Sequence, residues 1–346
     1  LKAALAGGGR LYVGGCGGEP PGLYDALARR PDVVSGATVF GVWIPGVNRR
    51  DWTALGPDVR AESIFAAPDW RGGIEAGRFD FVPETYSQTW ARYSKAGADA
   101  AVFRVSSPDR NGDVSLGPTA DFALSVRSAR FKIAVVDLQT PRNCNSPRLS
   151  LSEFDRVLES GDDPVAYDPG EADEAVRAIA RRVADLVPEG GTVQTGLGKI
   201  GPEVLRALRD RKNLSVWSGM VTDPLIELLD RDVVDRVVTG AALGSTALLD
   251  RLDGERRVRF APVGETHDHE NLKRIPRLVA VNSAIEVDLF GQANGEVLDG
   301  RQVSGGGGMV DFLRGARASE GGLPILALTS TARRGTVGRI VPRLSG

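Results

Sequence analysis

An internal repeat of strand, glycine turn and helix is the feature that most constrains the fold. Displaced by 182 positions, the chain matches itself without a gap: Gly14 on Gly196, Pro20 on Pro202, and Leu23 on Leu205. A second match is displaced by 179 positions: Ala101 on Ala280, Asp109 on Asp288, and Gly112 on Gly291. Chance similarity of two βα units is the alternative explanation. Two matches at nearly equal displacements predict two domains of one architecture.

Short β-branched runs alternate with amphipathic helices along the chain. We expect strands at 11–13, 135–137, 193–195, 214–217, 237–239, 278–282 and 325–328, and helices at 23–30, 172–186 and 204–211. This alternation predicts an α/β fold with open, mainly parallel sheets. The stretch 159–171 is acidic, carries two prolines, and is typical of a linker. We therefore predict a first domain at residues 1–165 and a second at 166–346.

Charge and cysteine content exclude several classes of protein. Lys and Arg number 43 against 45 Asp and Glu, a net charge of -2 that argues against nucleic-acid or anionic membrane binding. No apolar run is long enough to span a membrane, and LKAALAGGGR at the start lacks a secretory signal pattern. Cys16 and Cys144 cannot form a disulfide framework, and a CxxC motif is missing, so we expect a cytoplasmic protein without structural zinc.

Glycine, at 43 of 346 residues, gathers in short loops where the backbone turns sharply or approaches a ligand. Residues 196–201, GLGKIG, fit the dinucleotide pattern GxGxxG. Asp223, the acid about twenty residues on, is better explained as a turn or cap residue. The four glycines Gly305, Gly306, Gly307 and Gly308 have two interpretations. One is a flexible surface loop; the other is a backbone that lies against a substrate and donates N–H bonds to an oxyanion.

An apolar strand at 278–282 leads into a pair of carboxylates, Glu286 and Asp288. Side chains at i and i+2 of a strand share one face, and the carboxyl ends of parallel strands border the usual ligand crevice. Asn282 and Ser283 are possible supporting residues. The alternative is a solvated strand end.

His267 and His269 are the only histidines, so the HxH spacing has no further histidine to complete a metal site. A GxSxG nucleophile elbow and a Walker loop are missing as well. Acyl chemistry would therefore run on a carboxylate nucleophile, with Cys16 and Cys144 as formal alternatives.

Five motifs together resemble a known family. They are VNSAIEVDLFGQ (281–292), SGGGGMVDFLRGA (304–316), TSTARRGTVGRIVP (329–342), GRFDFVPETYS (77–87) and VSSPDRNGDVSLG (105–117). These segments resemble the acetyl-CoA hydrolase/transferase family of class I CoA-transferases, which includes the 4-hydroxybutyrate CoA-transferases. The resemblance runs from about Gly8 to Pro342.

This resemblance implies two tandem domains of the sugar-phosphate isomerase/CoA-transferase type, with the active site between them. It implies that Glu286 is the nucleophile, and that the loops at 305–308 and at Gly196 and Gly198 bind CoA and the oxyanion. The expected reaction is ping-pong transfer of CoA from an acyl-CoA to a small carboxylic acid through a glutamyl-CoA thioester. CoA is then a substrate, no prosthetic group or metal is needed, and a homo-oligomer is expected.

Two departures from the family pattern leave other functions open. The family commonly shows Ser-Glu-Met where this chain has Ser218-Gly219-Met220, so an acidic side chain is missing near the predicted cleft. Residues 143–145, Asn-Cys-Asn, depart from a second family motif. An acyl-CoA thioester hydrolase on the same scaffold, and a non-catalytic CoA-binding or partner subunit, are the alternatives.

Overall fold

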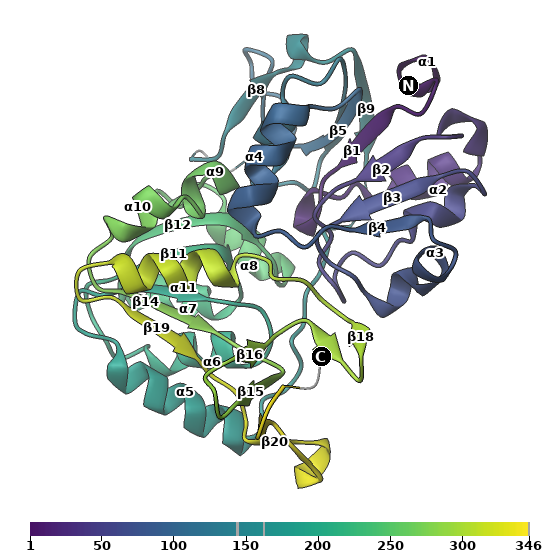
Figure 1. Cartoon of the computed structure of the whole chain (residues 1–346). Helices are drawn as coiled ribbons and strands as arrows, with labels where there is room; N and C mark the ends of the chain where they lie inside the picture. Colours follow the sequence, from purple (N-terminus) through teal and green to yellow (C-terminus); the bar gives the residue numbers. More distant parts are fainter. Residues whose placement is uncertain (143–144, 162, 345–346) are drawn as a thin grey trace.

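Two parallel sheets form the two halves of the molecule (Figure 1). The computed structural model describes residues 1–142, 145–161 and 163–344, so Cys144 and its neighbour Asn143 lie outside the described residues. The first sheet has the order β4 (Phe79–Phe81), β3 (Arg60–Ser63), β2 (Thr38–Phe40), β1 (Arg10–Val13), β5 (Ala100–Val105), β7 (Phe131–Asp137) and β9 (Arg156–Ser160).

The second sheet has the order β13 (Val258–Phe260), β12 (Val234–Ala242), β11 (Leu214–Val221), β10 (Thr192–Thr195), β14 (Leu278–Asn282) and β19 (Leu323–Leu326). Neighbouring strands of both sheets run parallel. The predicted α/β class is therefore confirmed. The strand expected at 325–328 begins two residues earlier, at Leu323.

Corresponding strands of the two sheets occupy corresponding places. Strand β1 lies between β2 and β5, and β10 lies between β11 and β14. The glycine loops that the sequence repeat aligns follow directly after β1 and β10. The repeat therefore reflects two copies of one strand order. The exact boundary at 165/166 stays a prediction; it falls between β9 and the first helix of the second half.

Helices cover the sheets, and local sequence determines where they begin. The helix expected from Ala172 begins instead at Glu174, because the Asp173 side chain accepts a hydrogen bond from Val176 N and caps the helix. Its apolar positions face the core, as a period of 3.6 residues requires. The helices are α1 (Lys2–Leu5), α2 (Pro21–Ala28), α3 (Arg71–Glu75), α4 (Tyr86–Ala96), α5 (Glu174–Leu186), α6 (Ile200–Ala207), α7 (Pro224–Asp230), α8 (Thr246–Leu252), α9 (Val263–Thr266), α10 (His269–Lys273) and α11 (Met309–Ala318).

Short strands outside the two main sheets form small ribbons. They are β6 (Asp113–Ser115) with β8 (Arg148–Ser150), β16 (Ala293–Asn294) with β15 (Glu286–Asp288) and β22 (Ile340–Val341), β17 (Val297–Leu298) with β18 (Arg301–Gln302), and β20 (Thr331–Ala332) with β21 (Val337–Gly338). The carboxylate pair predicted at the end of a main-sheet strand lies in β15, a separate strand after β14. The predicted position at the end of a main-sheet strand is therefore wrong, and Glu286 lies outside the main sheet.

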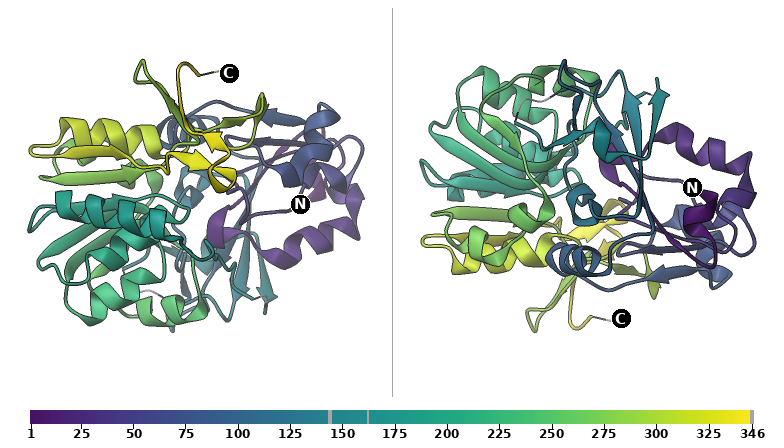
Figure 2. Two further views of the ribbon diagram at one scale, coloured as in Figure 1. Left: turned by 90° about the horizontal axis from the view of Figure 1, so that it is seen from below. Right: turned by 90° about the horizontal axis from the view of Figure 1, so that it is seen from above.

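The two halves lie side by side and contact each other directly (Figure 2). The N–H groups of Ala120 and Asp121 from the first half both donate to Gly240 O at the end of β12. On the other side, the Asp311 carboxylate of α11 accepts from Ser87 N at 3.0 Å and Ser87 Oγ at 2.7 Å, at the start of α4. These bonds fix the space between the carboxyl ends of the second sheet and the first half. Among the described residues, no helix has the length and apolar character to cross a membrane.

Candidate active site

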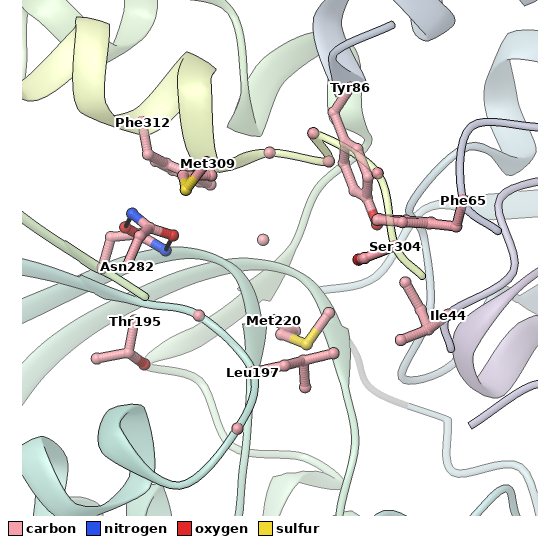
Figure 3. Close-up of a pocket in the computed structure, with 18 of the residues that line it drawn as sticks. Ile44, Phe65, Tyr86, Thr195, Leu197, Met220, Asn282, Ser304, Met309 and Phe312 are labelled. Carbon is pink, nitrogen blue, oxygen red and sulfur yellow. Dashed lines mark hydrogen bonds between the residues drawn. The ribbon is translucent and has the colours of Figure 1, made fainter. Parts of the chain in front are cut away.

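A cavity of about 430 Å³ lies between the two halves, at the carboxyl ends of β10 and β14. Figure 3 shows side chains from both halves around this space. Ile44, Phe65 and Tyr86 come from the first half, and Thr195, Asn282 and Phe312 from the second are drawn opposite them. Such a mainly apolar cavity at the carboxyl ends of parallel strands is the usual place for a ligand in an open α/β fold.

The four-glycine loop is docked against the first half of the molecule. Tyr86 N donates to Gly307 O at 3.1 Å, and Ala66 N donates to Ser304 O at 3.4 Å. A methyl group on Gly305 would collide with Ile64 O, so this position requires glycine for close approach of two backbones. The interpretation as a backbone laid along the cavity is thus favoured over a flexible surface loop.

This loop leads directly into helix α11, and it supplies donors that the protein itself does not use. Within the described part of the chain, the N–H groups of Gly306 and Gly308 have no acceptor. Both residues line the cavity, as does Met309 in the first turn of α11. The N-terminus of a helix carries a partial positive charge, so this corner of the cavity suits an oxyanion.

The loop at 196–198 also lines the cavity, but the N–H groups of its two glycines are already bonded. Gly196 N donates to Val281 O at 3.1 Å, and Gly198 N donates to the Tyr167 hydroxyl at 2.8 Å. These glycines therefore shape the wall. The expected turn role of Asp223 agrees with its contacts, because its carboxylate accepts from Ser245 N at 3.0 Å and ties two loops together.

The predicted nucleophile does not line the cavity. Glu286 is half-buried in β15, and its carboxylate accepts a hydrogen bond from Asn294 Nδ2 at 3.0 Å. Its predicted catalytic role stays a prediction. Of the supporting residues, Asn282 lines the cavity and donates to Gln194 Oε1 at 2.9 Å, whereas Ser283 is exposed outside it.

Asp288 stabilises a turn. Its carboxylate accepts hydrogen bonds from Phe290 N and Gln292 N, and from Leu344 N near the end of the chain. Burial alone would raise the pKa of Asp288, but the bonds from these backbone N–H groups outweigh it and lower the pKa. A carboxylate held in this way is a structural anchor for the segment after β15.

The cavity wall carries no Asp, Glu, Lys or Arg among the residues that the structure describes. Gly219, where the family pattern has glutamate, is part of this wall. A methyl group on Gly219 would lie 3.1 Å from both Cε1 and Nε2 of His267, so the imidazole occupies the space beside it. Burial lowers the pKa of His267 to about 3, and the ring is therefore neutral at physiological pH.

Several wall residues have no counterpart in the sequence prediction. Tyr86 and Met309 lie within motifs that carried the family resemblance, which was the available signal for them. For His267, the sequence pattern suggests only a metal ligand. No group of three His, Cys, Asp or Glu side chains that could hold a metal occurs in residues 1–142, 145–161 and 163–344.

Comparison with known proteins identifies the family. Residues 3–167 match the acetyl-CoA hydrolase/transferase N-terminal domain, and residues 244–346 match the C-terminal domain of the same family. The chain belongs to the acetyl-CoA hydrolase/transferase family. The family predicted from the sequence motifs is thereby confirmed.

Relatives in this family carry both transferase and hydrolase names. The 4-hydroxybutyrate coenzyme A transferase of Clostridium kluyveri is 29% identical over 339 residues, which cover 94% of this chain and 79% of the relative. The acetyl-CoA hydrolase of Eremothecium gossypii is 25% identical over 407 residues, covering 96% and 76%. An enzyme of the CoA-transferase or acetyl-CoA hydrolase type is thus confirmed at the level of the family.

Two solved structures share the fold over nearly the whole chain. RipA from Yersinia pestis superimposes with a TM-score of 0.91 and 29% identity, over all of this chain and 84% of RipA. The 4-hydroxybutyrate CoA-transferase from Porphyromonas gingivalis gives a TM-score of 0.80 and 27% identity, over 99% and 82% of the two chains. The predicted tandem α/β fold is confirmed by these neighbours.

Proposed function

We propose that this chain binds an acyl-CoA in the cavity between its halves and hydrolyses the thioester. The single observation that carries the proposal is the wall of the cavity, which has backbone N–H groups without an acceptor but, among the described residues, no carboxylate. CoA transfer through a glutamyl-CoA thioester needs a carboxylate nucleophile within reach of the thioester carbonyl. Without one, the carbonyl is open to direct attack by a molecule that enters the cavity.

The proposed ligand suits the wall. A short acyl chain is apolar, as are Phe65, Met309 and Phe312, and a thioester is uncharged. Its carbonyl oxygen, placed near the N–H groups of Gly306 and Gly308, would gain negative charge as the attack proceeds. Removing one such donor typically raises a barrier by about 3 kcal/mol, so these groups would supply a large part of the catalysis.

CoA transfer through Glu286 is the second candidate. One observation favours it: Glu286 follows the cavity residue Asn282 by only four positions, within a family whose relatives include CoA-transferases. That route predicts ping-pong exchange with a small carboxylic acid and a CoA adduct on the glutamate. It requires β15 to bring its carboxylate to the cavity.

One experiment separates the two reactions. Thiol release from acetyl-, butyryl- and succinyl-CoA is measured with and without added carboxylic acids, for the native chain and for Glu286→Gln. Hydrolysis predicts thiol release without any acid, retained within about threefold in E286Q. Exchange that depends on added acid, is lost in E286Q and leaves a CoA adduct on the Glu286 peptide by mass spectrometry would establish transfer instead.

A further inference from the structure

His267 lines the cavity beside Gly219 and Gly308, and one of its ring nitrogens has no hydrogen-bond partner among the described residues. His267 lines the cavity although its side chain is almost fully buried. A methyl group on Gly308 would collide with Nε2, and one on Gly219 would lie 3.1 Å from the same atom. Within the described residues, Nε2 makes no hydrogen bond, whereas Nδ1 lies 2.9 Å from Thr266 Oγ1. Only glycine at both positions lets the ring lie this close to the two backbone segments at the cavity wall.

The contacts of Thr266 Oγ1 are compatible with a proton on Nδ1. When the Thr266 hydroxyl donates to Pro262 O, which lies at 3.3 Å, its oxygen can accept a hydrogen bond from Nδ1–H at 2.9 Å, and we assign this tautomer. The neutral ring has one N–H, and placing it on Nδ1 leaves a lone pair on Nε2. Trp217 Nε1 donates to Thr266 O at 2.9 Å and fixes this segment against β11.

We propose that His267 Nε2 is the general base that activates water for attack on the bound thioester. This inference rests on the proposed hydrolysis and assigns its missing catalytic group. As the oxygen of water bonds to the carbonyl carbon, one proton passes from water to Nε2. The carbonyl electrons move to the oxygen beside the loop of Gly306 and Gly308.

Collapse of this tetrahedral intermediate re-forms the carbonyl and breaks the carbon–sulfur bond. The thiolate of CoA leaves and takes the proton from Nε2, so the products are a carboxylic acid and CoA, and the imidazole is neutral again. The imidazolium exists only while an oxyanion lies beside it, and that pairing offsets the burial that keeps the free ring uncharged. Phe312 and Tyr86 pack on the ring, with centroids at 4.6 and 4.8 Å, and hold its orientation.

The test compares His267→Gln and His267→Ala with His269→Gln, a control at the exposed second histidine. Thiol release from acetyl- and butyryl-CoA is followed at saturating and limiting substrate. We expect H267Q to lower kcat by 100-fold or more with KM within about threefold, and H269Q to match the native chain. Added imidazole should raise the rate of thiol release by H267A at least tenfold. Pyrrole, which has no basic nitrogen, should not raise it.

Two results overturn the role of His267: an unchanged kcat in H267Q, or an H267A variant that is folded by circular dichroism yet not rescued by imidazole. Both leave the proposed hydrolysis intact, because the native chain still releases thiol. If the native chain releases no thiol from any thioester without added acid, the proposed hydrolysis itself is wrong, and the role of His267 fails with it.

Discussion

The carboxyl ends of β1 and β10 are equivalent in the two sheets, yet one is filled and the other is open. After β1, the space left beside the glycine loop is about 20 Å³, the size of one water molecule. After β10, it is about 430 Å³. The same sequence of strand, glycine loop and helix therefore produces a packed joint in one half and a ligand cavity in the other.

Polar side chains fill the space at the carboxyl end of β1. The buried Asn48 amide accepts from Cys16 N and Ile44 N, and it donates to Cys16 O and Glu19 Oε2. Arg104 and Asp137 form a buried ion pair beneath the same loop, and Arg104 also donates to Gly17 O. At the carboxyl end of β10, the corresponding space is bordered mainly by apolar side chains and glycine, and its wall carries no charged side chain among the described residues. The difference shows that side chains outside the repeated motif decide whether a glycine loop serves packing or binding.

The largest expected effect on stability comes from Asp137→Ala, which removes the buried ion pair at the carboxyl end of β1. The variant leaves the Arg104 guanidinium buried without its carboxylate, and this should reduce the free energy of unfolding by about 3–5 kcal/mol. Urea denaturation followed by circular dichroism measures it. The control is Asp32→Ala, which removes an exposed partner of Arg30 and should leave the midpoint nearly unchanged. Equal losses in the two variants would contradict a special role for the buried pair.

A pH-dependent effect is expected from Asp121, a fully buried carboxyl that borders the small space after β1. Burial raises the pKa of Asp121 to about 7. The folded state then holds a proton that the unfolded state releases near pH 4, so stability falls as pH rises from about 4 to 7, by roughly 4 kcal/mol. Burial also raises the pKa of Glu19 to about 7, which acts in the same direction.

Asp121→Asn should therefore remove about half of the combined loss of stability that Asp121 and Glu19 cause as pH rises. The measurement is the difference in unfolding free energy between pH 5 and pH 8. Asparagine also tolerates the positive φ of 25° at this position. An identical pH dependence in D121N and the native chain would show that Asp121 is ionised in the folded state.

The third prediction concerns Gly308→Ala, which adds a methyl group to the wall of the cavity at the carboxyl end of β10. Its methyl group would meet His267 Cδ2 at 2.8 Å and collide with Nε2, displacing the ring from the oxyanion corner. We expect kcat/KM for thioester cleavage to fall by about 100-fold, because a displaced catalytic group costs this much. Gly161→Ala is the control, since no described residue other than its chain neighbours lies within 4 Å of the added methyl group. Full activity in G308A would show that this corner is not where the reaction takes place.

Local and repeated features of the sequence predict the element types and the two sheets. The period of α5 and the match of Gly14 with Gly196 predicted the element types and the two equivalent sheets, because periodicity and turn chemistry act over a few residues. The glycine loop at 305–308 lines the cavity, and its role in binding CoA and the oxyanion stays a prediction. Glu286 was expected at the end of a main-sheet strand, but the chain leaves that sheet after Asn282 and begins β15 four residues later. Pairing between strands that are distant in the sequence determines where the chain leaves the main sheet.

The amino-acid sequence by itself determined the α/β class, the repeated architecture and the family, since motifs of ten or more residues record which fold a chain adopts. Only the tertiary structure decided which residues surround the ligand space. Tyr86, Gly219 and His267 are far apart in the chain, and packing of one half against the other brings them to a single cavity. Their shared chemistry arises from long-range contacts, which no local pattern of residues specifies.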